Sequence, residues 1–477
     1  MCGCLFEVFF LSPLHCTFCR SCDPKKMLVA LLLLLVFGNA VEIFGEESDE
    51  QCRYKPELDP RPHSVSIVEF GAVGDGKTLN TGAFQNAIFY LNSFADKGGA
   101  QLYVPAGKWL TGSFNLTSHL TLFLEKDATI LGSQDPSQWG ITNQLPSYGS
   151  RTEKKRYRSL INGYSLSDVV ITGNNGIIDG QGSFWWDAFV AHTLNYSRPH
   201  LVEIVDSVGV VVSNLTFLNA PSYNIHPVYC SHVLVQNISA YAPPSSPDTV
   251  GIVPDSSDHV CIENSDISMG FDAIALKSGW DEYGIAYNRS TTYVHIKEVQ
   301  LQASAGSALV FGSQMSGGIS NVLAQQLHIN NSFTGIDFRT AIGRGGFMKN
   351  ITACNVSMEN VNTAFSANGQ WSTHPDDKYD PSALPVVDKI TIGNVIGVNI
   401  TIAGNFSGIE DSPFGISLYN ISLSLNAASS ATWVCSNVFG SSENVYPEPC
   451  PELESSLSSS SFVSVSTQIS DGLATDS

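Results

Sequence analysis

Short segments in which apolar and polar residues alternate recur along most of the chain. The alternation has a period of two, which is typical of β-strands. Each segment passes through Asn or a neighbouring polar residue into a second group of apolar residues. The segments are DVVITGNNGII from 168, GVVVSNLTFL from 209, HVLVQNISAY from 232, HVCIENSDI from 259, YVHIKEVQL from 293, NVLAQQLHI from 321, NITACNVSM from 350, KITIGNVIGV from 389 and GISLYNISLSL from 415.

The spacing of these segments indicates a repeat. Successive starts are 41, 23, 27, 34, 28, 29, 39 and 26 residues apart. The shortest intervals are similar in length, and the longer ones exceed them by a variable number of residues. This is typical of a solenoid with loops inserted on one side. Most intervals are too short for a crossover helix, which excludes a sheet of βαβ units, and Asn-Gly hairpin turns are scarce, which argues against an antiparallel sandwich. We therefore predict an all-β, single-stranded parallel β-helix.

The first coil of such a rod exposes its apolar interior and needs a cap. The segment TGAFQNAIFYLNSFA, residues 81–95, has apolar residues at helical spacing. We expect it to form a short helix that covers the N-terminal end, with Thr81 as a possible N-cap.

The two ends of the chain have compositions of their own. Lys25 and Lys26 precede a Leu-rich run of about fourteen residues, too short to span a bilayer and typical of a secretory signal. We assign the signal peptide to residues 27–45. Residues 1–26 contain C-x2-C-x2-C, which indicates either a small metal site or, as we favour, a segment absent from the mature protein. Residues 454–477 are Ser-rich, and we expect a disordered tail.

Cysteines and sequons agree with secretion. Six cysteines follow the predicted signal, and an even number in a secreted chain suggests disulfides. Cys435 and Cys450 are close in sequence and are the expected pair. Eleven N-x-S/T sequons follow the signal as well. The chain carries a formal charge of −20, so it has no cationic surface of the kind that nucleic acids require.

Several long motifs resemble the family 28 glycoside hydrolases, the plant polygalacturonases and their relatives. They occur in the family's order and cover about residues 64–453. The resemblance implies a right-handed parallel β-helix that acts on pectic polysaccharide in the plant cell wall, as a secreted monomer without a cofactor or a metal. The motifs are FGAVGDGKTLNTGAFQNAI from Phe70, YVPAGKWLTGSFNLTSHLTLFLEKDATILGS from Tyr103, IDGQGSFWWD from Ile178, NAPSYNIHPVYC from Asn219, PDSSDHVCIENSDISMGFDAIALKSGWDEYGI from Pro254 and GGISNVLAQQLHINNSFTGIDFRT from Gly317.

The resemblance implies inverting hydrolysis by two carboxyl groups, one protonating the leaving oxygen and the other activating water. In the family these groups come from N-T-D and G-D-D segments. Here the family's acidic positions hold Val250, Val253 and Phe271, and the G-H-G histidine is Ser307. Val and Phe cannot transfer protons. The standard family mechanism therefore cannot run in this chain as written.

The remaining candidates are few. Asp272 is the one family carboxylate left, and Asp248 lies one pleat from the substituted Val250, so the two are candidate catalytic residues. Asp248 is also a plausible turn cap, and Asp272 a structural acid. Lys277 and Arg339 are candidate substrate-binding residues, because cations suit a uronate carboxylate. His226 is a third candidate, because it matches the family's I-H-P motif. The alternatives are a structural role for His226 and a solvated surface for the two cations.

Other residues receive a structural interpretation. Asp255 lies in P-D-S-S and reads as a turn residue, while Asp337 reads as an ion-pair partner of Arg339 or Arg344. Two functions remain open at this point. One is a secreted polygalacturonase-type hydrolase with a non-standard catalytic set, and the other is a non-catalytic pectin-binding or wall-structural protein on the same scaffold.

Overall fold

A computed structural model describes residues 60–149, 155–371, 373–426 and 432–453. The predicted signal peptide, the segment upstream of it and the Ser-rich tail lie outside the described residues. None of the helices within the described residues is long and apolar enough to cross a membrane.

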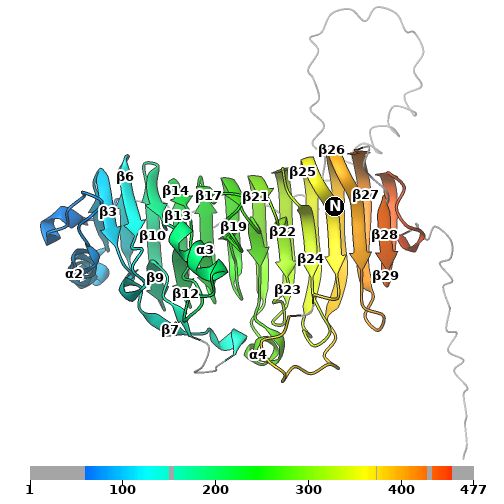
Figure 1. Cartoon of the computed structure of the whole chain (residues 1–477), viewed down its shortest axis with the longest axis horizontal. Coiled ribbons are helices and arrows are strands. Elements are labelled where there is room, and N and C mark those ends of the chain that lie inside the picture. Colours follow the sequence, from blue (N-terminus) through cyan, green and yellow to red (C-terminus); the bar gives the residue numbers. More distant parts are fainter. Residues whose placement is uncertain (1–59, 150–154, 372, 427–431, 454–477) are drawn as a thin grey trace, which may run out of the picture.

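The protein is a right-handed parallel β-helix, as predicted. Figure 1 shows an elongated rod with α2 at one end and β29 at the other. All but two strands join one parallel sheet, and β7 and β8 form a separate antiparallel pair. The first strands are β1 (His63–Ser66), β2 (Ala100–Val104), β3 (Gly107–Thr111), β4 (Phe114–Asn115), β5 (Leu120–Leu124), β6 (Ala128–Gly132), β7 (Ile141–Asn143), β8 (Lys155–Tyr157), β9 (Ile161–Tyr164), β10 (Ser167–Gly173), β11 (Gly176–Asp179), β12 (Val202–Val205), β13 (Val208–Ser213), β14 (Leu215–Leu218) and β15 (Tyr223–Val228).

The remaining strands are β16 (Ser231–Gln236), β17 (Ser239–Tyr241), β18 (Val250–Ile252), β19 (Asp258–Met269), β20 (Ile274–Leu276), β21 (Thr291–Ala303), β22 (Ser307–Gly312), β23 (Ile319–Asn330), β24 (Thr334–Arg339), β25 (Phe347–Asn368), β26 (Val386–Ser407), β27 (Phe414–Leu425), β28 (Trp433–Ser436) and β29 (Val438–Tyr446). Among the remaining strands, β25 and β26 are the longest, with 22 residues each. The helices are α2 (Thr81–Leu91), α3 (Ser183–Val190) and α4 (Asp281–Tyr287), with 3-10 turns η1 (Ile67–Phe70), η2 (Asn92–Lys97), η3 (Pro136–Gln138), η4 (Pro146–Tyr148) and η5 (Pro451–Leu453).

One column of β-branched residues shows how the repeated segments build the core. Each residue pairs with its equivalent in the next coil, and all are buried. Burying one such side chain stabilises a fold by about 1.5–3 kcal/mol, so the column holds successive coils in register. Its members are Val169, Val210, Val233, Val260, Val294, Val322, Ile351, Ile390 and Ile416.

Corner residues in the left-handed backbone region turn the chain from one face of the rod to the next. Asn214, Asn237, Asn264, Asn355 and Asn394 have φ between 50° and 55°. Asn tolerates this region better than most residues. This explains why Asn recurs at the middle of the repeated segments.

Both ends of the rod are closed. Helix α2 places Phe84 and Leu91 against the first coil, and Phe84 stacks on Phe114 with ring centroids 4.6 Å apart. The expected capping helix is therefore confirmed, but the proposed N-cap is not. Thr81 is the first helical residue, and its hydroxyl accepts a hydrogen bond from the Gly112 backbone N–H at 2.7 Å instead.

The last coil carries the disulfide Cys435–Cys450, which confirms the expected pair. Cys230 is buried and free.

Candidate active site

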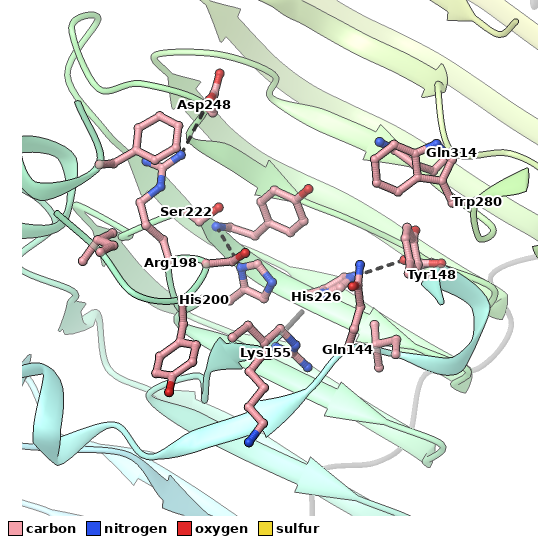
Figure 2. Close-up of a pocket in the computed structure, with 18 of the residues that line it drawn as sticks. Gln144, Tyr148, Lys155, Arg198, His200, Ser222, His226, Asp248, Trp280 and Gln314 are labelled. Atoms are coloured by element: carbon pink, nitrogen blue, oxygen red, sulfur yellow. Dashed lines mark hydrogen bonds and ion pairs between the residues drawn. The ribbon is translucent and has the colours of Figure 1, made fainter. Parts of the chain in front are cut away.

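A cavity of about 800 Å³ lies over the face formed by β12, β15, β18 and β20. Its walls come from loops inserted between coils, around η4 and β8, after α3, and before α4. Figure 1 shows β7 and α4 on the same long edge of the rod, and Figure 2 shows the cavity. The lining includes Tyr148, Lys155, Arg156, Arg198, His200, Tyr223, His226, Asp248, Asp255, Lys277, Trp280 and Gln314.

A chain of buried charges lies at the floor of the cavity. Glu203 of β12 pairs in register with His226 of β15, so both side chains leave the same face of the sheet. Arg156 of β8 donates to both oxygens of Glu203 at 2.5 Å. His226 Nδ1 lies 3.7 Å from Glu203 Oε2, and His226 Nε2 lies 3.3 Å from Asp255 Oδ2. Tyr148 donates to the same Asp255 oxygen at 2.5 Å.

These contacts set the protonation states at the floor. Burial alone would raise the pKa of Glu203, but the charge of Arg156 and the hydrogen bonds of His226 and Arg156 hold that pKa well below its ordinary value. Burial alone would lower the pKa of His226, but its bonds to Asp255 and Glu203 raise that pKa above 6.5. Burial and the neighbouring His226 lower the pKa of His200. His226 therefore lies between two acidic side chains, and its contacts with them favour its protonated form.

Lys277 reaches the cavity from the end of β20. Its Nζ donates to Gln314 Oε1 at 2.5 Å. Burial lowers the pKa of Lys277 to about 8, against the opposing effect of Asp272 and Asp255. Lys277 is thus a cation at neutral pH that loses its charge in mildly alkaline solution.

Asp248 and Arg198 meet at the rim of the cavity (Figure 2). Their closest atoms are 3.8 Å apart, and the Asp248 side chain is 59% exposed. Arg198 lies over the Phe189 ring at 3.9 Å and donates to the carbonyl oxygens of Pro221 and Pro247. Asp248 is therefore the carboxylate of the cavity that meets solvent most directly.

Asp272 lies in a separate buried cluster. Arg339 donates to both its oxygens, Nη1 to Oδ2 at 2.8 Å and Nη2 to Oδ1 at 3.0 Å, and the Ser307 N–H donates to Oδ1 at 2.8 Å. Arg339 Nε also donates to Asp337 Oδ2 at 2.6 Å, as the ion-pair interpretation of Asp337 expected. Burial alone would lower the pKa of Arg339, and the charges of Asp272 and Asp337 raise it. The rings of Phe271 and Trp371 lie 5.6 and 4.5 Å from the guanidinium carbon.

A small apolar cluster surrounds Val250 and Val253. Val250, Val253, Ala275 and Val310 are buried against one another, with Tyr223 and Phe271 packed on them. This cluster is separate from the main core. No proton donor or acceptor side chain stands at positions 250, 253 or 271.

The structure brings some of the predicted site residues together and separates others. Asp248, His226 and Lys277 line the cavity, whereas Asp272 and Arg339 bind each other and are not among its lining residues. Asp255, interpreted from its motif as a turn residue, is buried and bonded to Tyr148 and His226.

Sequence reasoning missed Glu203, Arg156, Tyr148 and His200. Of these four, Glu203 is the residue that a sequence signal could have indicated, through its register with His226 in the neighbouring strand. Trp185 and Trp186 are buried in the core, whereas Trp280 lines the cavity.

One cluster has the composition of a metal site. Ligand atoms of His200, Glu203 and His226 lie within 4.8 Å of one another. Arg156, however, donates to both oxygens of Glu203, so a fixed positive charge already stands where a cation would bind. The arrangement fits a charge network better than a metal centre.

Comparisons with known proteins place this chain in a family. Residues 96–444 match glycosyl hydrolases family 28, and the chain belongs to that family. It is 48% identical over 432 residues to a Vitis vinifera protein named "Probable polygalacturonase", covering 90% of this chain and 88% of that protein. A Chamaecyparis obtusa polygalacturonase is 27% identical, over 81% of this chain and 74% of that protein.

Among solved structures, an exopolygalacturonase from Thermotoga maritima is similar with a TM-score of 0.71. It is 25% identical, over 83% of this chain and 94% of that one. The chain is therefore a polygalacturonase-type member of family 28.

Proposed function

We propose that this protein is a secreted hydrolase that binds and cuts pectic polysaccharide in the plant cell wall. The cavity supports this proposal most directly. Lys155, Arg156, Arg198 and Lys277 line it against two acids, Asp248 and Asp255, although the whole chain carries a charge of −20. Such a local reversal of charge favours an anionic ligand and raises its local concentration.

The chemistry of a uronate chain fits these groups. Lys277 and the His226 imidazolium supply N–H donors at the floor, and Arg198 supplies a cation at the rim. Charge-assisted hydrogen bonds to carboxylates are about twice as strong as neutral ones. Trp280 and Tyr223 add flat apolar surface against which sugar rings can stack.

We assign hydrolysis to Asp272 and Asp248. Inverting cleavage needs a base that accepts a proton from water and an acid that protonates the leaving oxygen. Asp272 would serve as the base through Oδ2, which receives one hydrogen bond. Because Asp272 is buried beside the cavity and does not line it, this role requires that water reach it from the cavity. Asp248 at the exposed rim would serve as the acid.

A second candidate function is binding without cleavage. It is favoured by Arg339, which donates to both oxygens of Asp272, and by the apolar cluster around Val250 and Val253. In this case Asp272 only positions Arg339, and the cavity retains the polysaccharide.

Reducing-end release separates the two candidates. Purified protein is incubated with polygalacturonate, rhamnogalacturonan and xylogalacturonan, and its binding to each polymer is measured by gel retardation. Cleavage of one polymer supports the hydrolase, retardation without cleavage supports the binding protein, and neither result on any polymer overturns both. N-terminal sequencing of the extracellular protein tests secretion, and recovery of Cys2 or Cys16 there would contradict removal of residues 1–26.

A further inference from the structure

A second groove, with a volume of about 370 Å³, lies away from the cavity and shares no lining residue with it. Its lining includes Ser304, Asn331, Phe333, Asn360, Asn399 and Asn426. Ser304 precedes β22, Asn331 and Phe333 precede β24, and the others follow on later coils. We call this the amide groove. It crosses successive turns and so runs along the rod.

The amide side chains of the groove form a ladder. Asn360 Nδ2 donates to Asn331 Oδ1 at 3.2 Å, and Asn399 Nδ2 donates to Asn360 Oδ1 at 2.7 Å. Strands in register lie about 4.8 Å apart, so the ladder offers amides at a regular spacing. The three Asn side chains are exposed.

The ladder leaves hydrogen-bonding groups available to a ligand. Each amide has two N–H donors and an oxygen with two lone pairs, and the ladder uses only some of them. Within the described residues, Asn331 Nδ2 donates to no partner and Asn399 Oδ1 accepts from none. A sugar hydroxyl both donates and accepts, so a row of such groups matches a row of hydroxyls.

Phe333 supplies the apolar element of the groove. It is 54% exposed although a phenyl ring normally gains by burial. Among the described residues that line the groove, none is charged. A flat apolar ring beside uncharged amides suits the C–H face and hydroxyls of a neutral sugar, whereas the cation-lined cavity suits an acidic one.

We propose that the amide groove binds a neutral polysaccharide chain, separately from the acidic polymer in the cavity. The occupant is a run of uncharged sugar residues, as in the neutral side chains of pectic polymers or in neutral wall glucans. Two sites on one rod would raise the residence of the protein on a wall that contains both kinds of polymer.

The test uses native gels that contain arabinan, galactan or xyloglucan. Wild-type protein should be retarded by at least one of them, and Phe333→Ala should weaken that binding about tenfold, because a phenyl ring that buries against a sugar gives roughly that factor. Asn360→Leu, which breaks the ladder at its centre, should weaken it as well. Which polymer retards the protein identifies the source of the sugar.

The matched control is Phe89→Ala, since Phe89 is 84% exposed on α2 at the end of the rod. It should leave retardation unchanged. Retardation by neutral polymers should persist at high salt, where binding of polygalacturonate to the cavity falls. Polygalacturonate binding should also be unchanged in Phe333→Ala, so the failure of this proposal is separate from failure of the proposed function.

Three results would overturn the proposal. Two of them are wild-type protein that no neutral polymer retards, and retardation that Phe333→Ala leaves intact. The other is a glycan on Asn399, which is itself a sequon with Thr401 in the groove. Glycopeptide mapping of the mature protein decides this, because an attached glycan would cover the groove.

Discussion

Arg339 binds both carboxylate oxygens of Asp272 from a strand two coils further along the rod, at 2.8 and 3.0 Å. The two residues are 67 positions apart in the sequence. The contact ties Asp272, a candidate catalytic residue, to a buried cation. Whether Asp272 takes part in proton transfer or only holds Arg339 in place therefore depends on this contact.

Asp272→Asn is the direct test of this relationship. The amide keeps the shape but cannot accept a proton, so cleavage of any pectic polymer should fall at least about 100-fold. Binding of the polymer should change little, because Asp337 still holds Arg339. Reducing-end release and gel retardation are measured on the same preparation, with the thermal midpoint as a check of folding. Brisk cleavage of polygalacturonate that survives the substitution would show that Asp272 does not act in the reaction.

Glu203→Gln should destabilise the protein strongly. It leaves Arg156 buried without its charge partner, and removing one member of a buried ion pair costs about 3–5 kcal/mol. The midpoint of denaturant unfolding should fall accordingly. Glu298→Gln is the control, because Glu298 forms an exposed pair with Lys297 at 3.4 Å and exposed pairs contribute about 1 kcal/mol or less. Equal effects of the two substitutions would contradict the network at the cavity floor.

The affinity for polygalacturonate should fall as the pH rises above neutrality. The pKa of His226 is raised above 6.5, so its charge is present below that pH and is lost as the pH rises through the raised value. Lys277, with a pKa lowered to about 8, loses its charge in the next step. Retardation measured from pH 6 to 9 should decline in both steps.

Lys277→Arg provides the control for this pH dependence, because Arg stays charged throughout this range. The variant should lose only the step near pH 8. An affinity that is constant across the range in wild-type protein would remove these two groups from the binding site.

Reducing Cys435–Cys450 should loosen the C-terminal end of the rod. The disulfide closes a loop of 15 residues, for which the chain-entropy relation gives about 3 kcal/mol. The double substitution to Ser should lower the unfolding midpoint because it removes the loop constraint. Cys230→Ser removes no such constraint, because Cys230 is a free thiol in the core. A midpoint that the double substitution leaves unchanged would contradict a stabilising role.

The repeat made most of the fold predictable. Each segment carries its own β-branched residues to the same inward column, as Val233 and Val260 show, so local pattern and long-range register agree. Helix α2 was also predictable from the sequence, because its apolar residues repeat at helical spacing. Helices α3 and α4 were not predicted, since they lie in insertions whose position depends on the cavity they enclose.

The site was harder to predict because its contacts cross coils and loops. Tyr148 and Asp255 are 107 residues apart, and Arg156 and Glu203 are 47 apart. A motif relates residues within one segment, so it does not indicate which loop packs over which strand. For that reason it indicated the cavity residues Asp248, His226 and Lys277, but not the contact of Asp272 with Arg339.

The double substitution Val250→Asp with Phe271→Asp should not raise the cleavage of polygalacturonate above that of wild type. Val250 is buried among Val253, Ala275 and Val310, and a carboxylate there loses its hydration without gaining a donor, which costs several kcal/mol. Phe271→Asp is milder, because its ring lies 5.6 Å from the Arg339 guanidinium and the new carboxylate would face a cation. The double variant should therefore unfold at a lower temperature than Phe271→Asp alone. Val208→Asp, at an exposed strand position, should cost little by comparison.

Activity of the double variant should stay low for a second reason. Arg339 is already occupied by Asp272 and Asp337, so no cation is left at that position to hold a uronate beside the new acids. Ser307 donates its hydroxyl to Asp337 at 2.9 Å. The two introduced acids would thus face a centre whose other groups are bonded to one another. Reducing-end release from polygalacturonate that rises clearly above wild type in a folded double variant would contradict this argument.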